Sequence, residues 1–182
     1  MEEDAKRALF LDQIKSADAD ARYRSWRSAG PVGSKAVPAL GDLLSSPDKG
    51  VAKSAKGALE TIALYAGRPH AAAEAHAVSE ELLKIAASDS PIPARAEALR
   101  MLGFTADRRS VPAIARLLND PAVRDEARMA LERIPGRESL DALRSAVRTA
   151  PEEFKPNLEQ SVYNRGLRPA TIGIVALTTE LS

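Results

Sequence analysis

Residues 110–134 read SVPAIARLLNDPAVRDEARMALERI, and this stretch predicts two short helices joined by a tight turn. Apolar residues recur at helical spacing in each half, at Val111, Ile114, Leu117 and Leu118 and then at Val123, Ala127, Ala130, Leu131 and Ile134. Between the halves, Asp120 is a favourable helix N-cap and Pro121 suits the first helical position. The stretch therefore predicts a helical hairpin with an apolar edge on each helix.

One such hairpin is too small to hold a core, and the chain supplies further copies of it. Residues 36–62, AVPALGDLLSSPDKGVAKSAKGALETI, match almost position for position, with two extra residues in the turn. Looser copies follow near residues 82–102 and 140–163. The prolines predicted to open the second helices are Pro47, Pro91, Pro121 and Pro151. The last three are evenly spaced and the first gap is longer, so an insertion near residues 65–77 is expected to lengthen the first helix of the middle repeat.

This repetition predicts an all-α fold, a right-handed α-α superhelix or solenoid of about five two-helix repeats. We expect one domain over residues 1–182. Within it, residues 1–33 form an N-terminal capping repeat, residues 34–166 the core repeats, and residues 167–182 a C-terminal segment.

The C-terminal segment, LRPATIGIVALTTELS, departs from the repeat pattern. As a helix it is apolar on all sides, which is unusual for a capping position because a cap needs a polar outer face. A partner or a second copy is expected to cover it, so self-association through residues 167–182 is predicted, unless later repeats follow in a longer array. A tail, or a β-strand over residues 171–177, is the alternative.

The same short motifs open and close the predicted hairpins. Val-Pro-Ala-Leu or Val-Pro-Ala-Ile opens them at residues 37–40 and 111–114, and an Asp-Pro turn lies at residues 120–121. Ala-Leu steps close them at Ala58-Leu59, Ala98-Leu99 and Ala130-Leu131. In these motifs residues 19–166 resemble the HEAT-repeat superfamily, specifically the short repeats of phycobilisome lyases. The resemblance implies the fold and leaves the function open, because solenoids of this kind host unrelated activities.

Composition excludes several classes of function. The formal net charge is +1, which argues against a protein whose main task is to coat nucleic acid. The absence of cysteine excludes disulfides, thiolate metal sites and cysteine catalysis. The first residues, MEEDAKRALFLDQIK, lack the basic start of a secretory signal, and no segment reaches membrane-spanning length. A cytoplasmic protein without a membrane partner is predicted.

The insertion holds both histidines, each four residues before a glutamate, at His70–Glu74 and His76–Glu80. Imidazole and carboxylate ligands at that spacing share a helix face and suit a divalent metal ion. On one helix, however, His70 and His76 would point to different sides. We therefore predict no metal site and no cofactor.

Resemblance to HEAT-like enzymes carries over no catalytic residue. HEAT-like hydroxylases hold a di-iron centre with His-Glu dipeptides, and this chain contains none. The active-site residues of phycobilin lyases find no match either. HEAT-like DNA glycosylases use aromatic and acidic residues in a basic groove, whereas Trp26 is expected to be a core residue or a capping plate. The prediction is therefore a non-catalytic protein.

The remaining candidate site is the concave face, which second helices line in HEAT arrays. Its predicted contact residues are Arg22, Arg24, Arg27, Lys53, Lys56, Arg95, Arg100, Arg124 and Arg128. Acidic residues in the last two repeats predict a groove graded from basic to near-neutral or acidic. Such a groove favours a scaffold that binds an acidic peptide or protein segment in one orientation. The alternatives are a phycobilin-lyase-like accessory protein that holds a chromophore or cofactor, and a nucleic-acid binder that uses the same bases on phosphates.

Overall fold

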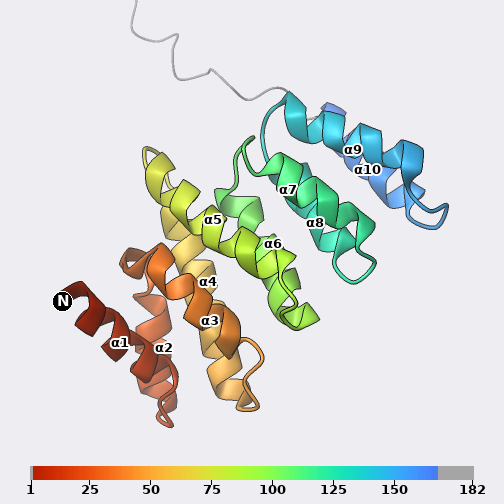
Figure 1. Ribbon diagram of the computed structural model, residues 1–182. Helices are drawn as coiled ribbons and strands as arrows, with labels where there is room; N and C mark the ends of the chain where they lie inside the picture. The colour runs from red at the N-terminus through yellow and green to blue at the C-terminus, as the bar shows by residue number, and fades with distance from the viewer. Residues whose placement is uncertain (1, 168–182) are drawn as a thin grey trace, which may run out of the picture.

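A computed structural model describes residues 2–167, and over this range the chain is helical and contains no strand. Ten α-helices follow one another as five hairpins (Figure 1). The first helices of the hairpins are α1 (Glu2–Ile14), α3 (Val37–Leu43), α5 (Ala72–Ala87), α7 (Val111–Arg116) and α9 (Arg137–Thr149). The second helices are α2 (Ala19–Arg27), α4 (Lys49–Ala66), α6 (Ile92–Thr105), α8 (Arg124–Arg133) and α10 (Lys155–Leu167). Three short 3-10 turns, η1 (Gly30–Val32), η2 (Ser34–Ala36) and η3 (Leu117–Asn119), join some of them.

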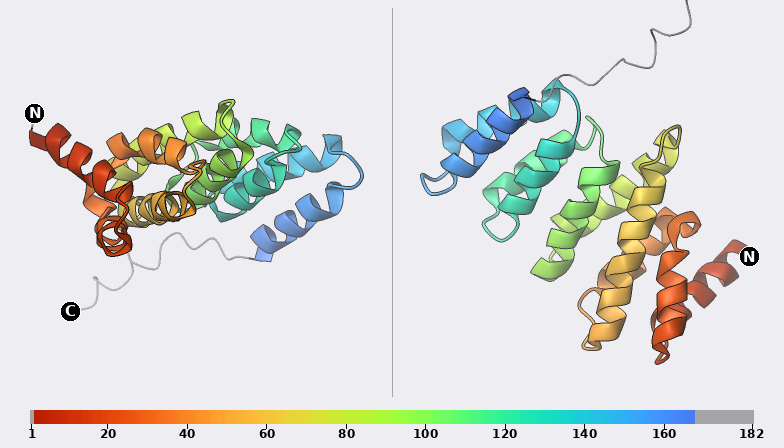
Figure 2. Two further views of the ribbon diagram at one scale, coloured as in Figure 1. Left: turned by 90° about the horizontal axis from the view of Figure 1, so that it is seen from below. Right: turned by 180° about the vertical axis from the view of Figure 1, so that it is seen from behind.

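The hairpins stack side by side into two layers. The second helices form one continuous row, in which each helix from α2 to α10 packs against the next second helix (Figure 2, right). In the other layer α3 packs against α5 and α7 against α9. Seen edge-on, the second helices lie on the inner side of a gentle curve (Figure 2, left). The predicted all-α solenoid of five two-helix repeats is confirmed. The predictions for residues 168–182 fall outside the described residues.

The core is continuous because equivalent positions of successive second helices point between the layers. Leu59 of α4, Leu99 of α6 and Leu131 of α8 are at most 1% exposed, as the shared Ala-Leu motif predicted. The alanine before each of them is also buried, and its small side chain lets neighbouring helices approach closely. Each buried leucine contributes about 2 kcal/mol of apolar burial. The repeated motif is thus the structural basis of the stack.

Helix α6 begins at Ile92, directly after Pro91, whereas α4, α8 and α10 begin later than their prolines predicted. Helix α4 begins at Lys49 with Asp48 as its N-cap, so neither Pro47 nor the preceding serine, Ser46, opens it. One carboxylate oxygen of Asp48 accepts hydrogen bonds from the amides of Gly50 and Val51, at 2.7 and 3.2 Å. The hydroxyl of Ser46 accepts from the amide of Asp48 instead. The proline belongs to the turn, and the aspartate after it caps the helix.

The later repeats show the same delay. Asp120 was predicted to cap the second helix with Pro121 at its first position, but α8 begins only at Arg124. The Asp120 side chain accepts a hydrogen bond from the amide of Ala122, and its carbonyl accepts from the amides of Val123 and Arg124. These bonds stabilise a turn before the helix. Likewise α10 begins four residues after Pro151.

The insertion lengthens helices, as expected. Helix α5 has 16 residues, compared with 7 in α3 and 6 in α7. Helix α4 before it has 18 residues. The middle of the stack therefore extends beyond its neighbours at the end where α4 turns into α5 (Figure 1).

Candidate functional site

The nine predicted contact residues all lie on the second-helix row. Arg22, Arg24 and Arg27 belong to α2, Lys53 and Lys56 to α4, Arg95 and Arg100 to α6, and Arg124 and Arg128 to α8. The structure brings them to one layer and divides them into two groups. One group pairs with carboxylates of neighbouring repeats, and the other does not.

Arg95 is bound within the stack. Its guanidinium donates a hydrogen bond to Asp120 at 2.5 Å and another to the carbonyl of Ala86 at 3.0 Å. Only 14% of the Arg95 side chain is exposed. The hydrogen bond from Arg95 lowers the pKa of Asp120 below its ordinary value, and the backbone amide of Ala122 acts in the same direction. Arg95 therefore joins α6 to the turn that precedes α8.

A second group of charges surrounds Glu97, which is 3% exposed. Lys56 of α4 approaches its carboxylate at 3.1 Å and Arg100 of α6 at 2.6 Å. Arg100 also reaches Glu126 of α8 at 3.3 Å. The other carboxylate oxygen of Glu97, Oε1, is buried without a hydrogen-bond partner among residues 2–167. Three successive second helices are thus tied together by one ionic cluster.

The arginines of α8 are tied to the last hairpin. Arg124 lies 3.4 Å from Glu153, and its guanidinium carbon is 4.6 Å from the centre of the Phe154 ring. Arg128 donates to the hydroxyl of Ser161 in α10 at 2.7 Å, and that hydroxyl donates to Glu132 at 2.8 Å. These contacts hold the last hairpin against α8. Glu153 is the carboxylate partner of Arg124, and Asp125 and Glu132, at 3.3 and 3.6 Å, are those of Arg128.

The cations of α2 and of the middle of α4 differ from Arg95, Arg100, Arg124 and Arg128 in having no carboxylate partner within the described residues. The exposed side chains of Arg24 and Lys53 make no ion pair or hydrogen bond with any residue in the described range. Arg27 donates to the hydroxyl of Tyr23 at 3.0 Å and lies 5.6 Å from the ring centre. Arg22 donates to the carbonyls of Ser16 and Ala17, which follow the end of α1. No carboxylate within residues 2–167 neutralises these four cations through an ion pair.

The two aromatic residues of α2 lie beside each other and differ in burial. Half of the surface of Tyr23 is exposed, and Arg27 donates a hydrogen bond to its hydroxyl. Trp26 is partly buried and packs against the core, as predicted for a core residue or capping plate. The two rings meet edge to face, with centres 5.3 Å apart. A Cβ atom on Gly57 would lie 2.9 Å from the Trp26 ring, so the ring rests directly on α4.

A pocket of about 520 Å³ lies between α2 and α4 beside these rings. Its lining consists of Ala19, Arg22, Tyr23, Trp26, Gly50, Lys53, Ser54, Lys56, Gly57 and Glu60. Its cations Arg22, Lys53 and Lys56 were among the predicted contact residues, but the cavity between the helices was not predicted. Gly50 and Gly57, seven residues apart on one side of a helix, were the signal, because they remove the side chains that would otherwise cover α4 there.

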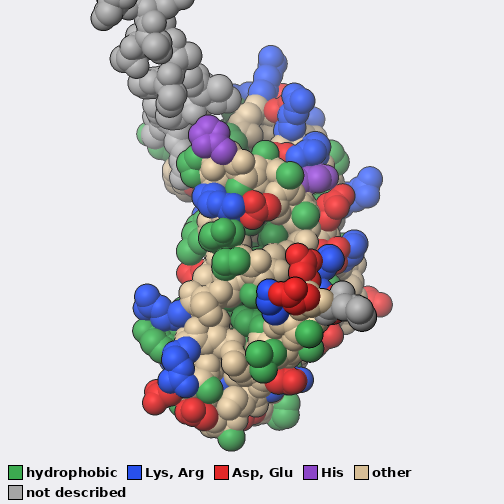
Figure 3. Space-filling view, turned by 90° about the vertical axis from the view of Figure 1, so that its left-hand side faces the viewer, with side chains coloured by type: hydrophobic (Ala, Val, Ile, Leu, Met, Phe, Trp, Pro, Cys, Tyr) green, Lys and Arg blue, Asp and Glu red, His purple; other side chains and the backbone are tan. Residues whose placement is uncertain are grey.

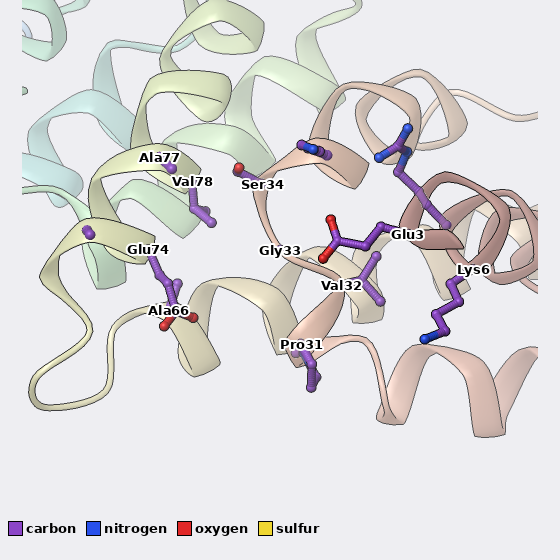
Figure 4. A pocket seen from close by; sticks show the side chains of 14 residues that line it. Glu3, Lys6, Pro31, Val32, Gly33, Ser34, Ala66, Glu74, Ala77 and Val78 are labelled. Carbon is purple, nitrogen blue, oxygen red and sulfur yellow. The ribbon is translucent and has the colours of Figure 1, made fainter. Parts of the chain in front are cut away.

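A second pocket, of about 720 Å³, opens where α1 faces the chain between α2 and α3 and the start of α5 (Figure 4). Glu3 and Lys6 line it from α1, Val32 from the connecting segment, and Glu74 and Val78 from α5. None of the nine predicted residues lines this pocket. It combines both signs of charge with apolar walls, and basic, acidic and apolar side chains are interspersed over this end of the molecule (Figure 3).

The histidines do not converge. His70 precedes α5 in a turn and has a φ of 67°, so the predicted helical His70–Glu74 pair is wrong. Glu74 instead accepts two hydrogen bonds from Arg68, which lower the pKa of its carboxyl. His76 lies in α5, 3.5 Å from Glu80. Among residues 2–167 no three His, Cys, Asp or Glu side chains gather as a metal site would require.

Residues 79–159 match the family model of HEAT repeats. This match confirms the predicted resemblance to the HEAT-repeat superfamily over these residues; the finer likeness to phycobilisome-lyase repeats stays a prediction. No curated protein matches the sequence. Among solved structures, one similar chain is the crystal structure of an engineered protein from a structural genomics consortium. The two are 20% identical, with a TM-score of 0.44, and the match covers 88% of this chain and 79% of that one.

HEAT repeats indicate a repeat scaffold, a class of protein that often binds other proteins. Within the described range, no helix is both long and apolar enough to cross a lipid bilayer.

Proposed function

We propose that the protein is a non-catalytic scaffold that binds another protein through its second-helix face, with the contact centred on α2 and α4. One observation carries this proposal. Arg24, Arg27 and Lys53 have no carboxylate partner within residues 2–167, whereas Arg95 and Arg100 of α6 and Arg124 and Arg128 of α8 are each paired with one. Unpaired cations on a surface are free to pair with a partner's acids.

The partner that this surface favours is an acidic protein segment. Positive charge gathers at α2 and α4, while the last hairpin presents Glu152, Glu153 and Glu159. Opposite charges at the two ends of a face orient an approaching segment and raise its association rate. The acidic end of the partner would therefore lie over α2 and α4.

The other predicted contact residues are assigned a different role. Arg95, Arg100, Arg124 and Arg128 join adjacent repeats, and Lys56 takes part in the cluster around Glu97. Changing one of them would weaken the stack, since it leaves a partly buried carboxylate without its partner. Partner binding would then fall only as a consequence of lost stability.

The test compares two double charge reversals. Arg24→Glu with Lys53→Glu reverses exposed cations of α2 and α4. The matched control, Arg108→Glu with Arg116→Glu, reverses exposed cations before and within α7, in the other layer. Partners recovered from cell lysate are quantified by mass spectrometry for each protein. We expect a set of proteins bound by the wild type and the control to be lost from the α2–α4 variant, and identical lists would refute the surface.

The same proteins separate the two alternatives. A bound chromophore would appear as absorbance beyond that of the aromatic residues in the purified protein. Nucleic-acid binding would appear as an affinity that falls steeply with salt and is abolished in the α2–α4 variant. The proposal predicts neither result. The cytoplasmic location and self-association remain predictions from the sequence.

A further inference from the structure

We propose that the pocket between α2 and α4 receives an apolar side chain of an acidic peptide segment, which lies against Trp26 while the segment's carboxylates pair with the surrounding cations. This inference rests on the proposed function and specifies the chemistry of the partner. The shape, the lining and the charges of the pocket support it.

The shape follows from two glycines of α4. At Gly50 a Cβ atom would lie 2.7 Å from the Arg22 guanidinium, and at Gly57 one would lie 2.9 Å from the Trp26 ring. Side chains of α2 therefore rest on the backbone of α4 at two glycines that are about two helical turns apart. Between those points the helices are separated by the cavity of about 520 Å³. The glycines place Arg22 and Trp26 at opposite ends of the cavity.

The lining is suited to an apolar group. Ala19, Tyr23 and Trp26 line it from one side of α2, and Ser54 lines it from α4 with its hydroxyl donated to the carbonyl of Gly50. That hydroxyl is therefore already satisfied within its own helix. Rings of Trp and Tyr bury a large area at low entropic cost, and such residues are frequent anchors of binding surfaces. An apolar side chain that enters here leaves the Ser54 hydroxyl with its hydrogen bond.

The rim is suited to carboxylates. Lys53 stands at the edge without an ion-pair partner among the described residues, and Arg27 is held on the ring of Tyr23. Arg22 donates hydrogen bonds from one terminal guanidinium nitrogen, Nη1, to carbonyls near the end of α1. Its other terminal nitrogen, Nη2, lies over Gly50. Each of these cations can donate a hydrogen bond to a partner's carboxylate without breaking an existing ion pair.

A peptide fits better than a nucleic-acid strand. Glu60 lines the pocket and makes no ion pair within residues 2–167, so it repels phosphates and carboxylates alike at that point. A peptide can place an uncharged residue beside Glu60, whereas a nucleic-acid strand carries a phosphate at every nucleotide. Beyond α4, Arg95, Arg100 and Arg124 are paired with carboxylates of the stack, so phosphates would find no continuous track of unpaired cations along the row. A segment with a few acids around one apolar residue matches both the cavity and the local charges.

Trp26 allows a direct measurement because it is the only tryptophan of the chain. The full chain is titrated with a synthetic Glu-rich peptide that carries one central leucine, and Trp26 emission is recorded. Parallel titrations use the same peptide with serine in place of leucine, a Lys-rich version, and single-stranded oligo-dT. We expect the leucine peptide to shift the emission, with an affinity at least about tenfold higher than that of the serine peptide.

Two variants test the two parts of the site. Lys53→Glu is expected to weaken the leucine peptide about tenfold or more, because an attraction becomes a repulsion. Ala19→Phe adds a ring at an exposed position of the pocket wall and should compete with the leucine. Arg116→Glu, on α7, should leave the affinity unchanged. Circular dichroism confirms that each variant is folded.

The outcomes are distinct. Equal affinity for the leucine and serine peptides would refute the apolar pocket, while the charge-based surface would stand if Lys53→Glu still weakened both. Tighter binding of oligo-dT than of either peptide would refute the choice of a peptide. No emission change with any acidic peptide would also refute this inference, and the proposed function would then rest on the lysate experiment alone.

Discussion

The carboxylate of Asp120 serves two structural purposes. One of its oxygens accepts from the amide of Ala122 in the turn before α8, and the other accepts from Arg95 of the preceding repeat. The sequence indicated only the first, because a capping aspartate is a local pattern. The pairing with Arg95 spans 25 residues and depends on how the hairpins stack. A single side chain thus fixes a turn and an inter-repeat contact.

We expect Asp120→Asn to lower the free energy of unfolding by about 1 to 2 kcal/mol, because the charged hydrogen bond from Arg95 is lost while the turn keeps its acceptor. Arg95 holds the pKa of Asp120 below its ordinary value, so the unfolded chain binds the proton at a higher pH than the folded one. The stabilisation is complete above the ordinary pKa and is lost as the pH falls through the lowered value.

Urea unfolding at neutral pH and at successively lower pH measures this effect. The difference between wild type and Asp120→Asn should shrink as the pH falls below about 4. Asp89→Asn is the matched control, since Asp89 is exposed and has no ion pair within residues 2–167. A difference that stays constant over the whole range would show that Arg95 does not act through the charge of Asp120.

Gly57→Ala tests the contact between α4 and Trp26. Alanine is the better helix former by about 1 kcal/mol, yet its methyl group would lie 2.9 to 3.0 Å from two ring carbons. We expect no gain in stability and a shift of Trp26 emission to longer wavelength as the ring is displaced. Gly166→Ala is the control, because beyond its chain neighbours and its own helix backbone no atom of the described residues lies within 4 Å of its Cβ position. It should leave the emission unchanged and raise stability by up to about 1 kcal/mol.

At the scale of the helix, the first turns of the second row were the part most difficult to predict. Asp48, rather than Ser46, caps α4, and α8 and α10 begin several residues after their prolines. Proline marks a turn in sequence, but the helix begins where a side chain or a turn carbonyl satisfies its first amides. The apolar stripes, by contrast, were placed correctly, because helical periodicity is set by the same residues that are buried.

Asp48→Ala should destabilise α4, the longest helix of the described chain, through loss of the cap on two of its amides. A loss of about 1 kcal/mol is expected in urea unfolding. Asp48→Asn keeps a side-chain acceptor and should retain most of the stability. If both variants lost the same amount, the charge at the start of the helix, and not the hydrogen bonds, would be responsible.

At the scale of the molecule, the main contacts of each hairpin are with its immediate neighbours in the stack. The fold could be predicted from sequence because each repeat restates the same pattern. The division of the second-helix cations into paired and unpaired groups could not be predicted from sequence. Ion pairs such as Lys56–Glu97 and Arg124–Glu153 form only between stacked repeats. The pocket between α2 and α4 was missed for the same reason, since it belongs to neither helix alone.

Leu143→Ala removes a fully buried side chain from α9 and should cost about 2 to 5 kcal/mol. In a stack with nearest-neighbour contacts, the loss should be felt mainly at the C-terminal end. The urea midpoint from circular dichroism should therefore fall more than the midpoint from Trp26 fluorescence, which reports on α2. Leu40→Ala, a fully buried position in α3 near the N-terminal end, should show the reverse order and lower the Trp26 midpoint at least as much as the circular-dichroism midpoint. Coincident shifts in Leu143→Ala would mean that the repeats unfold as one unit.

Gly50 and Gly57 open a cavity whose walls come from only two adjacent hairpins. These two hairpins could therefore be transferred together to a longer or shorter array of repeats of about thirty residues, where they would retain their ligand preference. The number of additional repeats would change only the length of the solenoid.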